Sequence, residues 1–418
     1  MSGSAHGCLP GKAGTSMTKP TINPGRSHQE LVDDRATISS RKDDHVRLAA
    51  RIRSQEVEPY QLAVWDELDQ CEFIHQALPE IAVDQVDISS IVAGIAQSSP
   101  FFINAMTGGT VGTNALNSQL AAVASRMGAA MALGSMSILV KKPEVQGFYR
   151  TLRKDNPNVN FIANLGAEHS VEAAQLVVET VDAQALQLHL NAAQEIVMPE
   201  GSRDFRGWTD HIGRIVDAMD KKGVPVIVKE VGFGLSRETV EQLYSLGVRW
   251  VDLAGKGGTN FIRIENERRK EALRRPDCQG ETQGELQLHG SAHADSLDFS
   301  YLSSWGISTL RSLLEARSVS ERFGDLHIIA SGGVRNPLDV VKYLASGADC
   351  VGLSGFFLKA IQEEGVEGTV ALVDEWKEHI RLLMALLGVR DIQDLRSSAS
   401  LVYPQSLVSY CRQRGIRL

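Results

Sequence analysis

The chain has 418 residues, of which 43% are hydrophobic, and its formal net charge is −8. The acidic balance argues against a nucleic-acid partner, and no stretch approaches the ~18 apolar residues of a membrane span. The five cysteines are scattered, with neither metal-ligand nor redox spacing, so we expect a soluble, reduced, cytoplasmic protein.

Residues 1–40 form a first zone, rich in Gly, Pro, Ser and Thr and without hydrophobic period. This composition predicts a flexible N-terminal tail. A helix is expected to start at Ser40, because serine caps a helix and Asp43 and Asp44 suit its first turn. Residues 41–99 are then expected to pack as an N-terminal segment on a main domain over 100–390, with a helical segment over 391–418.

From residue 100 onward, short apolar runs alternate with stretches of helical period. Helices are expected, for example, over 114–127, 171–181, 238–246 and 337–346. Such alternation favours parallel strands with right-handed crossovers, and eight units close naturally into a (β/α)8 TIM barrel. An open doubly wound sheet is the alternative. The eight runs are Phe101–Met106, Ala129–Gly134, Asn160–Gly166, Ala185–Asn191, Pro225–Val231, Trp250–Gly255, Leu326–Gly333 and Cys350–Gly355.

The connection after the sixth run is unusually long. Residues 264–297 are polar, charged and without period, which predicts a long loop at the rim where barrel active sites lie. His289 and His293 are four residues apart with Cys278 nearby, but no second ligand pair accompanies them. A solvated loop is therefore favoured over a zinc site.

The fourth run alternates strictly between apolar and polar residues. Leu186, Leu188 and Leu190 would pack against helices, and Gln187, His189 and Asn191 would point into the barrel. A buried polar row is costly unless it is hydrogen-bonded. It is either a satisfied structural network or, because Gln194 and Glu195 follow at the rim, part of a site.

Lys229 and Glu230 end the fifth run and would point to opposite sides of the strand. A buried Lys needs a partner such as a phosphate, a carboxylate or an electron-rich ring. The alternative is an ion pair between the two residues at the rim.

The seventh and eighth runs end in glycine-rich turns. In barrels, the loops after these strands bind phosphate through backbone N–H groups and a helix N-terminus, and Arg335 would add a charge-assisted fork. Tight turns alone would also explain the glycines. The loops after the first and sixth runs, 104–110 and 255–260, suit the close approach of a flat ligand or an anion, but each is a weak signal by itself.

In combination, these stretches resemble the type 2 isopentenyl-diphosphate isomerases, a flavin-dependent family. The resemblance runs in order from about residue 40 to 360. It is carried by Arg41-Lys42-x-x-His45, Ala105-Met106-Thr107-Gly108-Gly109, Ala163-Asn164-Leu165-Gly166, His189-Leu190-Asn191-x-x-Gln194-Glu195, Met198-Pro199-Glu200-Gly201, Lys229-Glu230-Val231-Gly232-Phe233-Gly234, Gly257-Gly258-Thr259, Trp305-Gly306 and Ser331-Gly332-Gly333-Val334-Arg335.

The resemblance implies an enzyme that uses reduced FMN and Mg²⁺, with NADPH as reductant, to isomerise isopentenyl diphosphate to dimethylallyl diphosphate. It also implies a homo-oligomer, a tetramer or an octamer. The residues implied to bind FMN are Ala105, Met106, Thr107, Gly108, Ser135, Asn164, Lys229 and Thr259, with Gly332, Gly333, Arg335, Ser354 and Gly355 at its phosphate.

The resemblance also implies roles around the substrate. Gln194 and His189 would be catalytic, and Glu195 would ligate Mg²⁺. The substrate would be bound by Arg41, Lys42, His45, His189, Asn191 and Gln194. Many members of the family carry an Arg for the diphosphate where this chain has Ser137.

Three other functions compete with this one. An FMN barrel that oxidises a 2-hydroxy acid would want a His–Arg pair at the flavin, and a nucleotide dehydrogenase would want a Cys in the loop over 255–260. Neither feature is evident. A barrel that only binds flavin or diphosphate would not need the Gln194–Glu195 pair.

Overall fold

The computed structural model describes residues 42–49, 51–52, 64–65, 67–106, 111–274 and 297–418. Several predictions fall outside these residues. They concern the tail over 1–40, the site residues Arg41, Thr107 and Gly108, and the loop residues Cys278, His289 and His293.

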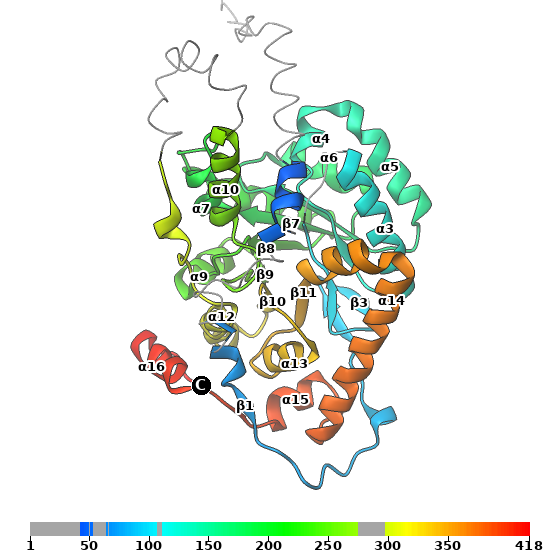
Figure 1. The fold of residues 1–418 in the computed structure, drawn as a ribbon, viewed down its shortest axis with the longest axis vertical. Coiled ribbons are helices and arrows are strands. Elements are labelled where there is room, and N and C mark those ends of the chain that lie inside the picture. Colours follow the sequence, from blue (N-terminus) through cyan, green and yellow to red (C-terminus); the bar gives the residue numbers. More distant parts are fainter. Residues whose placement is uncertain (1–41, 50, 53–63, 66, 107–110, 275–296) are drawn as a thin grey trace, which may run out of the picture. The chain divides into compact units, whose positions relative to one another are not determined.

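Eight parallel strands close into a barrel in the order β10-β11-β4-β5-β6-β7-β8-β9, which confirms the predicted (β/α)8 fold (Figure 1). Each of the eight apolar runs forms one strand. In chain order the strands are β4 (Phe101–Ile103), β5 (Met131–Ala132), β6 (Phe161–Gly166), β7 (Ala185–Leu190), β8 (Val226–Glu230), β9 (Trp250–Asp252), β10 (His327–Ser331) and β11 (Cys350–Leu353).

Helices between the strands cover the barrel, and the four predicted as examples are present within a few residues of their expected ends. Their N-termini explain the boundaries: the hydroxyls of Ser170, Ser236 and Ser308 and the amide oxygen of Asn336 each accept a backbone N–H from the first turn. The helices and 3-10 turns up to β11 are α3 (Val111–Met127), α4 (Ser137–Lys141), η2 (Pro143–Val145), α5 (Gln146–Asp155), α6 (Val171–Val181), α7 (Ala192–Val197), α8 (Trp208–Asp220), α9 (Arg237–Ser245), α10 (Phe261–Arg274), η3 (Ser300–Leu302), α12 (Thr309–Phe323) and α13 (Pro337–Ala345).

The long connection after β9 is more regular than the sequence suggests. Its predicted irregular stretch began at Ile264, but α10 occupies Phe261–Arg274. Asn260 caps this helix by accepting the N–H of Arg263 at 3.1 Å, and Ile262 and Ile264 bury its inner face. The residues that follow Ile264 in this helix are mostly charged, so the sequence shows no apolar periodicity that would predict it.

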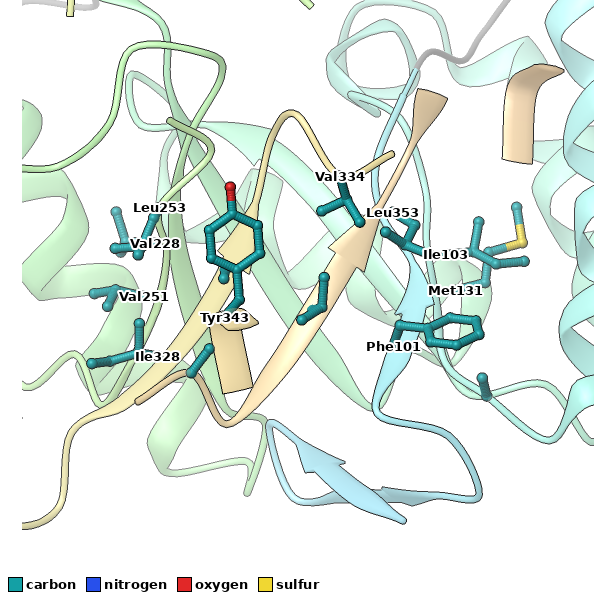
Figure 2. Close-up of a cluster of buried hydrophobic side chains, with 14 of the residues drawn as sticks. Phe101, Ile103, Met131, Val228, Val251, Leu253, Ile328, Val334, Tyr343 and Leu353 are labelled. Carbon is teal, nitrogen blue, oxygen red and sulfur yellow. The ribbon is translucent and has the colours of Figure 1, made fainter. Parts of the chain in front are cut away.

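Two cores meet at the barrel wall. The larger core lies between the strands and the surrounding helices, and Figure 2 shows part of it, including Phe101, Val228 and Tyr343. The smaller core fills the amino-terminal end of the barrel. A hairpin of β2 (Ser90–Val92) and β3 (Ile95–Gln97) plugs this end with Val92 and Ile95, because the apolar barrel floor would otherwise meet water.

The segments outside the repeat are fixed to the barrel. Residues 42–49 are helical and pair with α10 through Arg47 and Glu271. β1 (Glu72–Phe73) pairs antiparallel with β12 (Leu401–Val402). The other elements are η1 (Val83–Gln85), α14 (Gly355–Leu386), α15 (Ile392–Ser398) and α16 (Gln405–Arg414). Within the described residues, no helix is both long and apolar enough to cross a bilayer.

Candidate active site

The polar row of β7 points into the barrel, as the alternation predicts. Leu186 and Leu188 belong to the outer core, and Gln187 and His189 face the interior. Gln187 Nε2 donates to Asn104 Oδ1 at 3.1 Å, and Asn164 Nδ2 donates to Gln187 Oε1 at 3.0 Å. His189 Nδ1 lies 2.8 Å from Asn164 Oδ1. The row is therefore hydrogen-bonded rather than merely buried.

The row ends on a buried anion. Asp252 on β9 is fully buried and accepts Asn104 Nδ2 at 2.7 Å and the hydroxyl of Ser331. Lys229 Nζ lies 3.5 Å from the same carboxylate and donates to the backbone oxygen of Glu230. A buried charge is tolerated when it is paired and hydrogen-bonded in this way.

Glu230 does not pair with Lys229 through its carboxylate. One carboxylate oxygen accepts the backbone N–H groups of Val231, Gly232 and Phe233 at 2.5–2.8 Å. Burial raises the pKa of Glu230 to about 7, although these three donors and Lys229 favour the charged form. The side chain thus shapes the loop after β8, and the ion pair considered from the sequence is absent.

His189 is neutral at physiological pH in the free protein. Its pKa is lowered to about 4, chiefly by burial and with smaller contributions from Lys229, His169 and Lys42, against the opposing effect of Glu168. An anion placed against this ring would favour its protonation.

A second cluster joins the N-terminal helix to the rim. Glu265 on α10 is fully buried; its Oε1 lies 2.7 Å from His45 Nε2 and accepts Gln194 Nε2 at 3.3 Å. Its other oxygen accepts Arg268 Nε at 2.8 Å. Burial alone would raise the pKa of Glu265, but His45 and Arg268 lower it to about 2. Two predicted substrate residues thus meet on one carboxylate.

Glu195 lies beside this cluster on the short helix α7. Its carboxylate accepts Asn191 Nδ2 at 2.8 Å and the backbone N–H of Ser202 at 2.7 Å. No group of three or more His, Cys, Asp or Glu ligands forms among the described residues. A hard cation at Glu195 would take its remaining oxygen ligands from water, from carbonyl or amide groups or from a bound molecule.

The glycine-rich loops after β9 and β10 lie backbone against backbone. A Cβ on Gly258 would lie 2.8 Å from the nitrogen of Gly333, and Gly332 and Gly333 have φ of +97° and +80°. α14 starts beside them after β11, and no side chain caps its N-terminus. Uncapped N–H groups at a helix N-terminus attract anions, so this corner suits a phosphate.

Arg335 follows the same loop but is already paired. Its guanidinium forms two hydrogen bonds with Asp69, at 2.9 and 2.6 Å, and two with Asp339, both at 2.9 Å. It also lies over the ring of Trp65. The structure therefore shows it tying the segment over 64–73 to the barrel.

Comparison with known proteins identifies the family. The chain is 40% identical to the isopentenyl-diphosphate delta-isomerase of Staphylococcus epidermidis over 90% of its length and 97% of the relative. It is 42% identical to that of Latilactobacillus sakei over 91% and 97%. The chain belongs to the isopentenyl-diphosphate delta-isomerase family. Residues 153–402 also match the model of the FMN-dependent dehydrogenases, which supports FMN as the cofactor.

Solved structures agree with this fold. A mandelate oxidase variant with an FMN adduct has a TM-score of 0.54 and 14% identity, and covers 84% of this chain and 93% of its own. A flavocytochrome b2 variant with benzoylformate has a TM-score of 0.57 and 18% identity, and covers 93% and 91%. At these identities the likeness concerns the barrel alone.

The predicted site residues of this isomerase-family chain fall into four places. Asn164, His189 and Lys229 lie in the interior row. His45, Asn191, Gln194 and Glu195 gather at the rim between α7 and α10. Lys42 donates to the backbone oxygen of Ser135 at 3.2 Å. The loops after β4, β10 and β11 hold Ala105, Met106, Gly332, Gly333, Ser354 and Gly355. Thr259 is exposed in the loop after β9, and Arg335 forms the ion pairs described above.

Three residues that the structure places in the site were not predicted from the sequence: Glu265, Asp252 and Asn104. Asp252 is the single acid of an apolar strand, and Asn104 directly follows one, so the signal that singled out Lys229 was present for both. Glu265 lay in a stretch assigned to a loop. Recognising Asn260 as a helix cap would have placed this acid one turn into α10.

Proposed function

We propose that this chain interconverts isopentenyl and dimethylallyl diphosphate, with reduced FMN and Mg²⁺ as cofactors and NADPH as the source of reducing electrons. The observation that carries the proposal is the meeting of His45, Gln194 and Glu265 beside Glu195, in a chain 40% identical to named isomerases over nine-tenths of its length. The interior row is connected to this cluster along the chain, since His189 at the end of β7 precedes Gln194 on α7 by five residues.

The residues present fit FMN. The uncapped N-terminus of α14 and the turns at Gly332 and Gly333 would take the phosphate. Lys229, Asn164, Ser135, Thr259 and the stretch Ala105-Met106-Thr107-Gly108 would hold the ring system and ribityl chain. Arg335 would act on the phosphate indirectly, by holding the loop after β10 in place through Asp339.

The substrate diphosphate would lie near Lys42, His189 and Asn191, and Arg41, which precedes Lys42 in the sequence, would add a second cation. Diphosphate oxygens need cationic or N–H donors, and Mg²⁺ prefers a carboxylate plus phosphate oxygens. Glu195 would supply that carboxylate, held by Asn191 and the N–H of Ser202. Ser137, which stands where many relatives have Arg, contacts Ser135 and His169.

Moving the double bond requires a proton to be added at one carbon and another removed two carbons away. Reduced FMN would supply a group able to give and take a proton beside the alkene. Gln194 would lie at the reacting carbons, since Glu265 fixes its amide by accepting Nε2. Glu265 would also hold His45, so that one carboxylate positions groups from the N-terminal helix and from α7.

The test is an anaerobic assay of the full chain with isopentenyl diphosphate, Mg²⁺ and FMN, with and without NADPH or dithionite. Product that forms only when the flavin is reduced supports the proposal. A yellow, reducible protein that forms no product rejects the substrate. Size-exclusion chromatography with light scattering tests the tetramer or octamer, and fractionation of source cells tests the cytoplasm.

A second candidate function is the oxidation of a 2-hydroxy acid, because the chain matches the family model of the FMN-dependent dehydrogenases. The same assay can test it. Oxidation of a 2-hydroxy acid would bleach the oxidised flavin without added reductant. Bleaching by lactate or mandelate, with no isomerase product, would favour this function.

A further inference from the structure

The interior row has a direction, and its fixed end is Asn104. The backbone N–H of Ala105 donates to Asn104 Oδ1 at 2.8 Å, and a backbone nitrogen can only donate. On the other side, Asn104 Nδ2 donates at 2.7 Å to the buried carboxylate of Asp252, which accepts. Two independent groups therefore set the orientation of this amide.

Each following amide inherits its orientation from the one before. Since Asn104 Oδ1 is an acceptor, Gln187 must present Nε2 to it, which leaves Gln187 Oε1 for Asn164 Nδ2. Asn164 then has only Oδ1 left to face His189 Nδ1 at 2.8 Å. An oxygen without hydrogen requires a donor, so Nδ1 must carry the proton.

We propose that Asp252 and the amides of Asn104, Gln187 and Asn164 hold His189 in its Nδ1–H tautomer, so that Nε2 alone exchanges a proton when an anionic substrate binds. Asp252 and Gln187 are then positioning residues: Asp252 acts on His189 through three intervening amides, and Gln187 acts through one. In the part of the chain that the structure describes, Nε2 has no hydrogen-bond partner.

The consequence for binding follows from this geometry. A neutral ring with a bare Nε2 repels an anionic oxygen, whereas the imidazolium donates to it and keeps its Nδ1 bond to the row. Lys42, Lys229, His169 and Glu168 are the charged and titratable groups that act on this ring. His189 is therefore expected to take up one proton at Nε2 as diphosphate binds, without any movement of the amide row.

The Nδ1–H tautomer is expected in the FMN-loaded enzyme without substrate, whatever the substrate is. Only the choice of diphosphate as the anion rests on the proposed function. The experiment is solid-state 15N NMR of the FMN-loaded full chain labelled at histidine, with the His189 signals assigned from a His189→Gln sample. We expect a protonated Nδ1 and an unprotonated Nε2. Added inorganic diphosphate should protonate Nε2 and leave Nδ1 unchanged. A free enzyme with its proton on Nε2 overturns the proposal.

The cause is tested by breaking the row. Gln187→Met removes both hydrogen bonds with little change in volume, so Asn164 can turn and both tautomers should appear. Gln97→Met is the matched control: Gln97 is also buried and bridges two groups, the hydroxyl of Ser90 and the N–H of Ala130, at the other end of the barrel. It should leave the His189 signals unchanged.

The variant Gln187→Glu tests whether the tautomer of His189 depends on the hydrogen bond that residue 187 accepts, and not only on the packing of its side chain. A carboxyl there accepts from Asn164 Nδ2 whether protonated or not, so it should restore the single Nδ1–H tautomer. Gln187→Met with an unchanged tautomer overturns the role of the row. If the free enzyme shows the expected tautomer but diphosphate leaves Nε2 unprotonated, the row stands and the assignment of His189 to the diphosphate fails.

Discussion

Gln194 is the residue whose chemistry can be separated most cleanly from cofactor binding. It is buried, and it reaches Glu265 rather than the glycine-rich corner proposed for the flavin phosphate. We expect Gln194→Ala to lower kcat by on the order of 10²–10³, as when a hydrogen-bonding group that contacts the reacting atoms is removed. The Kd of FMN, measured by quenching of flavin fluorescence, should change by less than about twofold. Gln393→Ala, on exposed α15, is the control, and full activity of Gln194→Ala would exclude Gln194 from the reaction.

Glu265 should also govern acid stability. Its pKa of about 2 in the folded protein lies below its ordinary value of 4.5, so it stabilises the fold above pH 4.5 and this contribution disappears as the pH falls toward 2. We expect Glu265→Gln to remove pH-dependent stability on the order of 3 kcal/mol over that range, measured by urea unfolding.

Glu238 provides the comparison for this effect. Its pKa is also lowered to about 2, by Arg414, but the pair lies at the surface. Solvent screens such pairs, so Glu238→Gln should flatten the same curve by less than about 1 kcal/mol. Equal effects of the two substitutions would show that burial of Glu265 contributes nothing.

At the scale of elements, α14 is interrupted at Gly365, whose φ of 62° and ψ of −167° leave the helical region. A Cβ at Gly365 would meet nothing within 4 Å, so space does not limit a side chain there. We expect Gly365→Ala to destabilise the protein by ~1–3 kcal/mol through backbone strain alone. Gly147 in α5 is equally open but has no positive φ, so Gly147→Ala should stabilise by ~0.5–1 kcal/mol in the same thermal unfolding assay.

The tie between α13 and the segment over 64–73 depends on two unequal carboxylates. Asp339 is buried and holds both the backbone N–H and the guanidinium of Arg335, whereas Asp69 is 57% exposed. Asp339→Asn weakens the charge-assisted hydrogen bonds of a buried carboxylate and leaves Arg335 with only the exposed Asp69 as an anionic partner, so it should cost about 2–3 kcal/mol. Asp69→Asn should cost less than about 1 kcal/mol. The reverse order in chemical denaturation would contradict this account of the tie.

For the whole molecule, cofactor and fold should be linked. A ligand that binds only the folded state at 100 times its Kd stabilises it by about 2.7 kcal/mol. Because the entropy of unfolding grows with chain length, we expect FMN to raise the Tm of the apoprotein of 418 residues by roughly 3 °C. Riboflavin, which lacks the phosphate proposed to lie at α14, should raise it much less. An equal shift with riboflavin would count against the phosphate corner.

The sequence predicts the barrel well because apolar runs and helix caps are local signals. It also predicts the inward polar row, since the alternation of β7 is strict. It does not predict the contact of Glu265 with Gln194 or that of Asp69 with Arg335, because these pairs are 71 and 266 positions apart in the sequence. The contact of Asp339 with Arg335 is local, but it depends on which face of α13 is buried. The sequence indicates that the guanidinium of Arg335 needs an anionic partner. Only the structure shows that the carboxylates of Asp69 and Asp339 are those partners.

The pairing of β1 with β12 has a consequence for how the chain is made. Glu72 and Phe73 leave the ribosome early, but their partners Val402 and Leu401 emerge about 330 residues later. At synthesis rates of roughly 5–20 residues per second, the early strand waits some 20–60 s for its neighbour. The eight barrel strands have been synthesised before that, so the pairing of β1 with β12 is among the last contacts of the fold to form.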